Sequence, residues 1–123
     1  MSGKRDYAKS IILMGMKHSG KSTLGGMLAW EMKVKHLDLD DLVEEAYRSD
    51  RMLSCREIFR QHGKEVFMDL ERQAAAELSG RMRGNMLVAS LGGGTIENPP
   101  ALEALASRGV FVYLRVDADV LFR

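Results

Sequence analysis

The strongest constraint on the fold is the stretch IILMGMKHSGKSTLGG, residues 11–26. Its apolar run ends at Gly15, and the residues from Gly15 to Ser22 match the pattern G-x-x-x-x-G-K-[ST] at every fixed position. A short continuous apolar run predicts a buried parallel strand, and the residues from Gly20 to about Met32 predict a helix. Strand, glycine-rich loop and helix in this order predict a loop that binds nucleotide phosphates.

Each fixed position of this loop has a chemical role. The glycines let successive backbone N–H groups point at phosphate oxygens, and the helix that follows adds the positive end of its dipole. Lys21 is expected to reach the β- and γ-phosphates of ATP, and the Ser22 hydroxyl to bind Mg²⁺. The alternative is a glycine turn that binds nothing. The residues expected to bind ATP are Gly15, Lys17, Ser19, Gly20, Lys21, Ser22 and Thr23.

The rest of the chain alternates between predicted strands and predicted helices. Strands are expected at 10–14, 35–38, 86–91 and 110–114, and helices at 20–32, 39–49, 54–59, 64–82, from Pro99 or Pro100 to about 108, and from Asp117 onward. In the first helix, Leu24, Leu28 and Met32 form the expected apolar stripe, and Trp30 is expected to pack against a neighbour. The alternation predicts one domain, residues 1–123, with a three-layer α/β/α fold around a parallel sheet. Ligands of such sheets bind beyond the carboxyl ends of the strands.

Carboxylates follow the second predicted strand. Asp38 and Asp40 are two residues apart, so in extended chain their side chains would face the same way. One could hold Mg²⁺ through water, and the other could accept the proton of an attacking hydroxyl. Asp41 would point elsewhere and help to start the next helix. The alternative is that all three residues simply cap that helix.

Three consecutive glycines, Gly92, Gly93 and Gly94, follow the third predicted strand. They cost backbone entropy, and they suit a place where a ligand lies against the main chain. The alternative is a tight turn.

Taken together, the phosphate loop, the pair Asp38 and Asp40, the pattern Ile58-Phe59…Gly63…Phe67…Glu71 and the triple glycine resemble shikimate kinases in order and spacing. The resemblance implies a P-loop kinase that transfers the γ-phosphoryl group of ATP to the 3-hydroxyl of shikimate. It also implies the site residues: Lys21 and Ser22 for ATP and Mg²⁺, Asp38 as the acid near the metal, Asp40 as the suspected base that binds shikimate, and Phe59, Phe67 and Gly92 to Gly94 as the rest of the acceptor pocket.

The sequence departs from the family pattern at two places. Met68 stands where the family has an arginine that binds the shikimate carboxylate, so Glu71 loses the partner that it normally braces. The sequence also stops at Arg123, before the family's lid, its adenine-contacting loop and its final strand. Two alternatives to a shikimate kinase therefore stay open: a nucleotide-binding remnant without turnover, and a kinase for another small hydroxylated metabolite.

Composition limits the remaining partners. The 18 basic and 17 acidic residues give a net charge of +1, which offers no electrostatic case for nucleic acid or an anionic membrane. There is one cysteine, Cys55, and residues 1–10 lack the apolar segment of a signal peptide. We expect a cytoplasmic monomer whose partners are ATP or ADP, Mg²⁺ and a small-molecule substrate.

Overall fold

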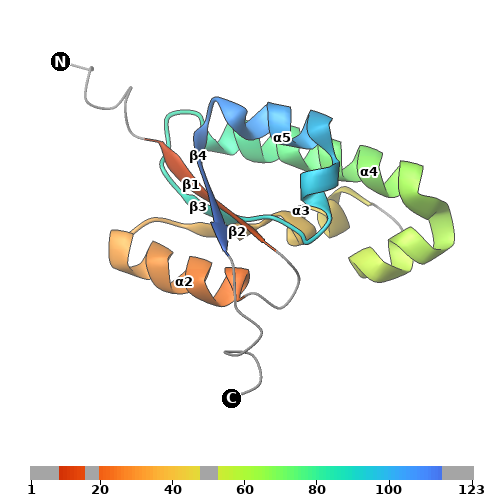
Figure 1. Ribbon diagram of the computed structural model, residues 1–123, viewed down its shortest axis with the longest axis horizontal. Helices are drawn as coiled ribbons and strands as arrows, with labels where there is room; N and C mark the ends of the chain where they lie inside the picture. The colour runs from red at the N-terminus through yellow and green to blue at the C-terminus, as the bar shows by residue number, and fades with distance from the viewer. Residues whose placement is uncertain (1–8, 16–19, 48–52, 115–123) are drawn as a thin grey trace.

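The predicted sheet is present. A computed structural model describes residues 9–15, 20–47 and 53–114 (Figure 1). Its strands are β1 (Ser10–Gly15), β2 (His36–Asp38), β3 (Val88–Ser90) and β4 (Gly109–Leu114). All pair in parallel in the order β2-β3-β1-β4. The helices are α2 (Lys21–Met32), α3 (Leu39–Ala46), α4 (Cys55–Met82) and α5 (Pro99–Ala106), with a 3-10 helix, η1 (Thr95–Glu97), before α5.

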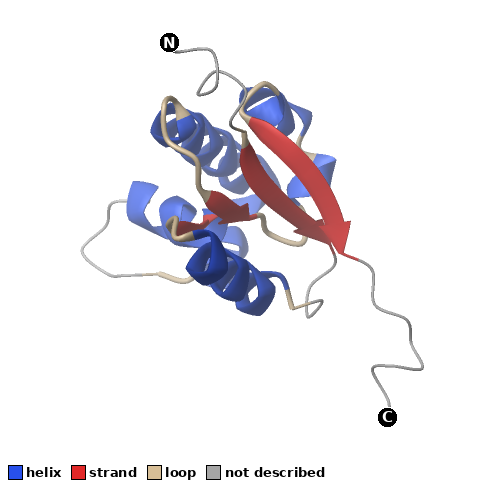
Figure 2. Ribbon diagram, turned by 90° about the vertical axis from the view of Figure 1, so that its left-hand side faces the viewer, coloured by secondary structure: helices blue, strands red, loops and turns tan. Residues whose placement is uncertain are grey.

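Helices cover both faces of the sheet. Helix α2 lies on one face and α3, α4 and α5 lie on the other (Figures 1 and 2). Successive residues of β1 point to opposite faces. Ile12 therefore joins the larger core cluster, which includes Leu39 and Leu78, whereas Leu13 packs with Ala29 of α2. Burial on both sides explains the continuous apolar run, and the predicted α/β/α class is confirmed.

Helix α4 joins two helices that the sequence predicts separately. Gly63, with φ of +89°, breaks the helical geometry between them. The predicted capping box is present: the Glu57 backbone N–H donates to Ser54 Oγ, and the Ser54 N–H donates to Glu57 Oε1, both at 3.2 Å. The strand expected over 86–91 is shorter, and the helix expected from Asp117 lies outside the described residues.

The face through which helix α2 packs only partly matches the one that the sequence predicts. Its buried residues are Lys21, Gly25 and Ala29, while Leu24 is 40% exposed and Trp30 is 83% exposed. The reason is close packing, because a Cβ atom on Gly25 would lie 2.5 Å from His36 Nε2 and 2.7 Å from Ser90 Oγ. Small residues therefore take the position closest to the sheet, while Leu28 and Met32 are partly buried and pack against the cluster of Leu13, Ala29 and Val88. The predicted stripe is confirmed at Leu28 and Met32 and wrong at Leu24, and the predicted packing of Trp30 is wrong.

None of the helices in the described part of the chain is long and apolar enough to cross a bilayer.

Gly109 pairs with Ser10 at the start of β4. A Cβ atom there would lie 2.6 Å from the carbonyl oxygen of Ser10 and 2.9 Å from Ile12 Cδ1. Because a backbone atom cannot move aside cheaply, we expect Gly109→Ala to lower the free energy of unfolding by about 1–3 kcal/mol. Urea denaturation measures this change.

Gly80 provides the matched control. It lies inside α4, and a Cβ atom there would meet nothing within 4 Å. Gly80→Ala should raise the free energy of unfolding by about 0.5–1 kcal/mol, because alanine is the better helix former. Equal effects at the two positions would mean that the close contact at Gly109 is not a constraint.

Candidate active site

The three regions singled out in the sequence line one cavity of about 270 Å³. It lies beyond the carboxyl ends of the strands, because its residues follow β1, β2 and β3 in the chain. The lining residues are Gly20, Lys21, Ser22, Thr23, Asp38, Asp40, Leu91, Gly92 and Gly93. The fold thus places the phosphate-binding loop beside the carboxylates and two of the glycines.

Lys21 is the first residue of α2 and is largely buried. Gly20 precedes it with φ of +87°, a value that favours glycine. The Lys21 ammonium donates a hydrogen bond to the carbonyl oxygen of Gly15 at 2.7 Å. Burial lowers the pKa of Lys21, against the opposing attraction of Asp40 and Asp38. The cation is therefore held at the helix N-terminus, directed back across the loop.

The start of α2 is anchored by two residues that the sequence analysis missed. Ser90 Oγ, in β3, donates to the backbone carbonyl of Lys21 at 3.2 Å and lies 2.8 Å from His36 Nε2. Because the serine hydrogen goes to Lys21, the His36 N–H is the donor in the second bond. A polar residue inside an apolar strand was the one sequence signal for Ser90.

Asp38 serves two purposes. Its Oδ2 accepts a hydrogen bond from the Ser22 hydroxyl at 2.6 Å, and its Oδ1 accepts one from the Asp40 backbone N–H at 3.1 Å. The second bond makes Asp38 the N-cap of α3. The capping interpretation therefore holds for Asp38, together with the predicted contact to the phosphate loop.

The predicted geometry of Asp40 is wrong. Asp40 lies within α3 rather than in extended chain, so it reaches the cavity from the first turn of a helix. Burial, followed by the charges of Asp38 and Glu71, raises the pKa of Asp40 to about 6. A carboxyl group with a pKa near neutrality suits proton transfer.

The donor atoms near the phosphate loop fit Mg²⁺ but not a metal site built by the protein alone. No group of three or more histidine, cysteine or acidic side chains in the described ranges could hold a metal. Ser22 and Asp38 supply hard oxygen atoms 2.6 Å apart. Mg²⁺ commonly takes one or two such protein ligands and fills its remaining positions with water and phosphate.

Comparison with known proteins identifies the lineage. The family model described as "Shikimate kinase" matches residues 17–123. The chain belongs to the shikimate kinase family. It is 33% identical to the shikimate kinase of Caldanaerobacter subterraneus subsp. tengcongensis over 94% of this chain and 63% of that protein. It is 37% identical to the shikimate kinase of Francisella tularensis subsp. novicida, over 90% of this chain and 60% of that protein.

Solved structures agree with this assignment. Shikimate kinase from Acinetobacter baumannii in complex with shikimate has a TM-score of 0.80 at 30% identity, covering 98% of this chain and 63% of that one. Shikimate kinase from Aquifex aeolicus has a TM-score of 0.75 at 33% identity, covering 91% of this chain and 62% of that one. A gluconokinase from Sinorhizobium meliloti shares the fold at 17% identity. The chain spans about half to two thirds of the length of the relatives that it matches.

Glu71 has hydrogen-bond partners that the shikimate kinase pattern did not predict. It is 3% exposed, and its two carboxylate oxygens accept hydrogen bonds from Thr95 Oγ1 and Asn98 Nδ2, both at 2.8 Å. Asn98 Nδ2 also donates to the Met68 carbonyl at 3.0 Å. Although the family's arginine is replaced by Met68, the Glu71 carboxylate is not left without partners, because neutral donors on the segment after β3 bond to both of its oxygens.

Three residues that the resemblance named, Phe59, Phe67 and Gly94, are not among the residues that line the cavity. Phe59 and Phe67 pack edge to face on each other, with ring centres 5.8 Å apart, and Phe59 is 48% exposed. Gly94 does not line the cavity, unlike Gly92 and Gly93. Lys17 and Ser19 lie outside the described residues. Their roles stay predictions.

Gly92 keeps room for Asp40. A Cβ atom on Gly92 would lie 2.7 Å from Asp40 Oδ1, so Gly92→Ala should push the carboxylate aside without disturbing the core. We expect turnover to fall at least tenfold with little change in melting temperature, since small misplacements of a reacting group are costly. Steady-state kinetics and thermal denaturation measure the two effects.

Gly26→Ala is the control for this prediction. Gly26 lies inside α2, outside the cavity lining, and a Cβ atom there meets nothing within 4 Å. Equal losses of turnover in the two variants would contradict the steric role of Gly92.

Proposed function

We propose that this chain forms the nucleotide-binding and phosphoryl-transfer part of a shikimate kinase, acting in the cytoplasm as a monomer. The reaction is transfer of the γ-phosphoryl group of ATP to the 3-hydroxyl of shikimate. The observation that carries the proposal is the shared cavity of Lys21, Asp38, Asp40 and Gly92. Support for the acceptor comes from the Acinetobacter baumannii relative, which was solved with shikimate.

Lys21 supplies the positive charge for the transferred group. Its ammonium would leave the Gly15 carbonyl for the β- and γ-phosphates when ATP binds, and the backbone N–H groups at the start of α2 would hold the phosphate oxygens. Ser22 and Asp38 would hold Mg²⁺, which spreads the negative charge of the phosphates when it is bound. Together these groups favour a transition state in which charge collects on the phosphoryl oxygens.

Asp40 acts on the acceptor. Its carboxylate would orient the 3-hydroxyl of shikimate and take its proton while the hydroxyl oxygen forms the new bond to phosphorus. The bond between the γ-phosphorus and the bridging oxygen breaks, and ADP leaves. The raised pKa of Asp40, about 6, makes it a stronger base than an ordinary aspartate while leaving it mostly ionised at neutral pH.

An assay of ADP release with and without shikimate tests the proposal. The full-length protein should release ADP at a rate that depends on shikimate. ATP binding by calorimetry without any shikimate-dependent rate would favour a nucleotide-binding module instead.

Met68 favours one alternative, a kinase for another small hydroxylated metabolite. A thioether cannot pair with a carboxylate. Arg72, one turn away, is held by Asp69 at 2.9 Å on the surface, so it is engaged elsewhere. A screen of hydroxylated metabolites in the same assay would identify such a substrate.

Met68→Arg separates the two substrates. If shikimate is the acceptor, the new guanidinium should lower the KM for shikimate about tenfold or more, since a hydrogen bond to a charged group contributes about 1.5–3 kcal/mol. Met68→Gln is the control, because it adds polarity without charge. An unchanged KM in the arginine variant would argue against shikimate as the substrate of this site.

A further inference from the structure

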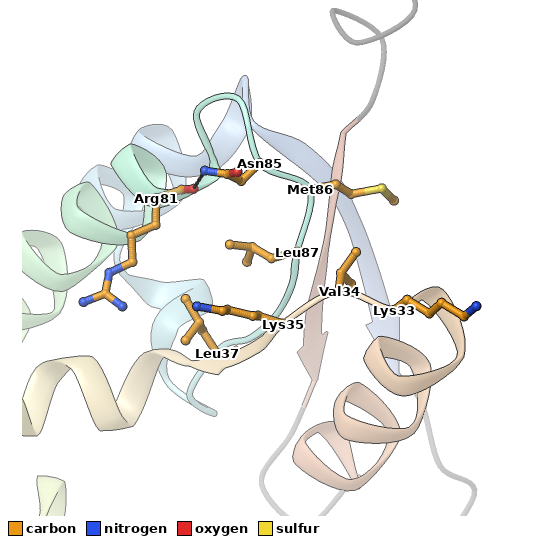
Figure 3. A pocket seen from close by; sticks show the side chains of 8 residues that line it. All are labelled: Lys33, Val34, Lys35, Leu37, Arg81, Asn85, Met86 and Leu87. Carbon is orange, nitrogen blue, oxygen red and sulfur yellow. Dashed lines mark hydrogen bonds between the residues drawn. The ribbon is translucent and has the colours of Figure 1, made fainter.

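A second and larger cavity, of about 780 Å³, lies away from the nucleotide site. Its lining residues, labelled in Figure 3, come from the segment before β2, from β2 itself, from the last turn of α4 and from the segment before β3: Lys33, Val34, Lys35, Leu37, Arg81, Asn85, Met86 and Leu87. Because the strands are parallel, this groove lies at the amino ends of the strands, whereas the nucleotide site lies at the carboxyl ends. The groove takes no part in the phosphoryl transfer proposed above.

The floor of the groove is apolar. Leu37 and Leu87 come from neighbouring strand segments, and Leu87 is only 4% exposed. The volume falls within the range of about 300–1,000 Å³ that is typical of small-molecule sites. Leu37 and two further lining residues, Val34 and Met86, are partly exposed, so an apolar ring or short chain would find both space and contact area here.

Two positively charged side chains lie on one side of this apolar floor. Figure 3 shows the Lys35 ammonium and the Arg81 guanidinium on the same side of the groove, whereas the Lys33 ammonium points the other way. Arg81 also contacts Glu77 at 3.0 Å, in a pair that is about half exposed. Within the described residues no salt bridge engages Lys35, and its backbone carbonyl is fixed by the Val88 N–H at 2.9 Å. Two positive groups thus face a ligand that would lie on the leucine floor.

We propose that this groove binds a small organic anion, namely a carboxylate or phosphate monoester carried on an apolar body. The leucines would contact the apolar body, and Lys35 and Arg81 would hold the acidic group. Arg81 offers a planar fork that matches carboxylate and phosphate oxygens, and Lys35 adds a point charge. The proposal is independent of the substrate of the nucleotide site.

Backbone NMR titration of the full chain tests this site. The probes are 3-phenylpropionate and phenyl phosphate, with neutral 3-phenylpropionamide and inorganic phosphate as comparisons. We expect the two organic anions to shift the amide signals of Leu37, Leu87 and Asn85 with millimolar affinity. Whichever of 3-phenylpropionate and phenyl phosphate binds more tightly identifies the preferred acidic group, carboxylate or phosphate. Binding of the neutral amide as tight as that of the acid would overturn the proposal, as would shifts confined to the nucleotide site.

Variants show which basic side chains bind the acidic group of the probe. Lys35→Gln and Arg81→Gln should each weaken binding of the preferred probe at least fivefold. Lys33→Gln removes the same charge from a side chain that points away, and it should change the affinity less than twofold. Glu77→Gln removes the competing carboxylate and should tighten binding two- to threefold. Equal losses in Lys33→Gln and Lys35→Gln would mean that net charge alone attracts the probe, and this would overturn the assigned site.

Discussion

Replacing Lys21 with alanine is expected to lower turnover by about two to three orders of magnitude, because the site would lose a preorganised charge aimed at the transferred phosphoryl group. Lys21 is only 9% exposed, and its ammonium already donates a hydrogen bond to the Gly15 carbonyl oxygen at 2.7 Å. Because Lys21 is largely buried, water cannot take the place of the lost ammonium donor. The same variant should bind ATP and ADP much more weakly in calorimetry.

The control for Lys21→Ala lies just past the other end of α2. Lys33 follows the other end of α2, is exposed and plays no part in the nucleotide cavity. Lys33→Gln should leave nucleotide affinity and turnover unchanged within twofold. Nucleotide affinity in Lys21→Ala within threefold of the parent protein would contradict the assignment of the phosphate site.

Replacing Asp40 with asparagine is the second change with a large expected effect. Asparagine keeps the shape of the side chain but cannot accept the proton of the attacking hydroxyl. We expect kcat to fall by about two to four orders of magnitude while nucleotide affinity stays within a few-fold, which separates Asp40 from Lys21. Steady-state kinetics and calorimetry together give this pattern. Asp41→Asn, at the exposed neighbouring position, should retain activity.

The raised pKa of Asp40 gives this prediction a pH dependence. Only the ionised carboxylate accepts a proton, and its pKa is about 6. The kcat/KM of the free enzyme should therefore rise about tenfold per pH unit up to about pH 6 and level off above it. In Asp40→Asn, kcat/KM should no longer rise with pH below about pH 6. If the rise remained unchanged in the variant, a group other than Asp40 would be responsible for the pH dependence.

The same shift affects stability in the opposite direction. Asp40 has a folded pKa above its ordinary value of 3.8, so between about pH 4 and pH 6 the folded chain binds more protons than the unfolded chain. The contribution of Asp40 to the free energy of unfolding is therefore largest in acid and is lost as the pH rises through about 6. Activity and stability thus change in opposite directions with the pH in this range.

The sequence allowed the sheet, and the strand and helix on either side of the phosphate loop, to be predicted because these depend on local patterns. A continuous apolar strand, a fixed glycine and lysine spacing and a capping box each act over a few residues. The start of α3 at Leu39 was predicted correctly, but the geometry of Asp40 was predicted wrongly. The extended-chain spacing was applied to Asp40, which lies in the first turn of that helix, where side chains two residues apart do not face the same way.

Long-range contacts explain why the sequence did not reveal the partners of Glu71 or the exposure of Trp30. Glu71 finds its donors 24 and 27 residues away, at Thr95 and Asn98, and no short pattern links these positions. Trp30 is exposed because Gly25 takes the packing position against His36 and Ser90. Only the closeness of the helix to the sheet decides which residues of α2 are buried.

The central place of β1 has a consequence for synthesis on the ribosome. Its two partner strands, β3 and β4, come much later in the chain, and the buried Ser10 hydroxyl accepts the Leu87 N–H from a residue 77 positions away. At translation rates of ~5–20 residues per second, the apolar β1 segment waits roughly 4 to 15 seconds for its first neighbour. Until then Ile12 and Leu13 have no sheet to enter, so the nascent chain presents them to chaperones or to other unfolded chains. The strand that begins the nucleotide site is therefore made among the first but completed among the last.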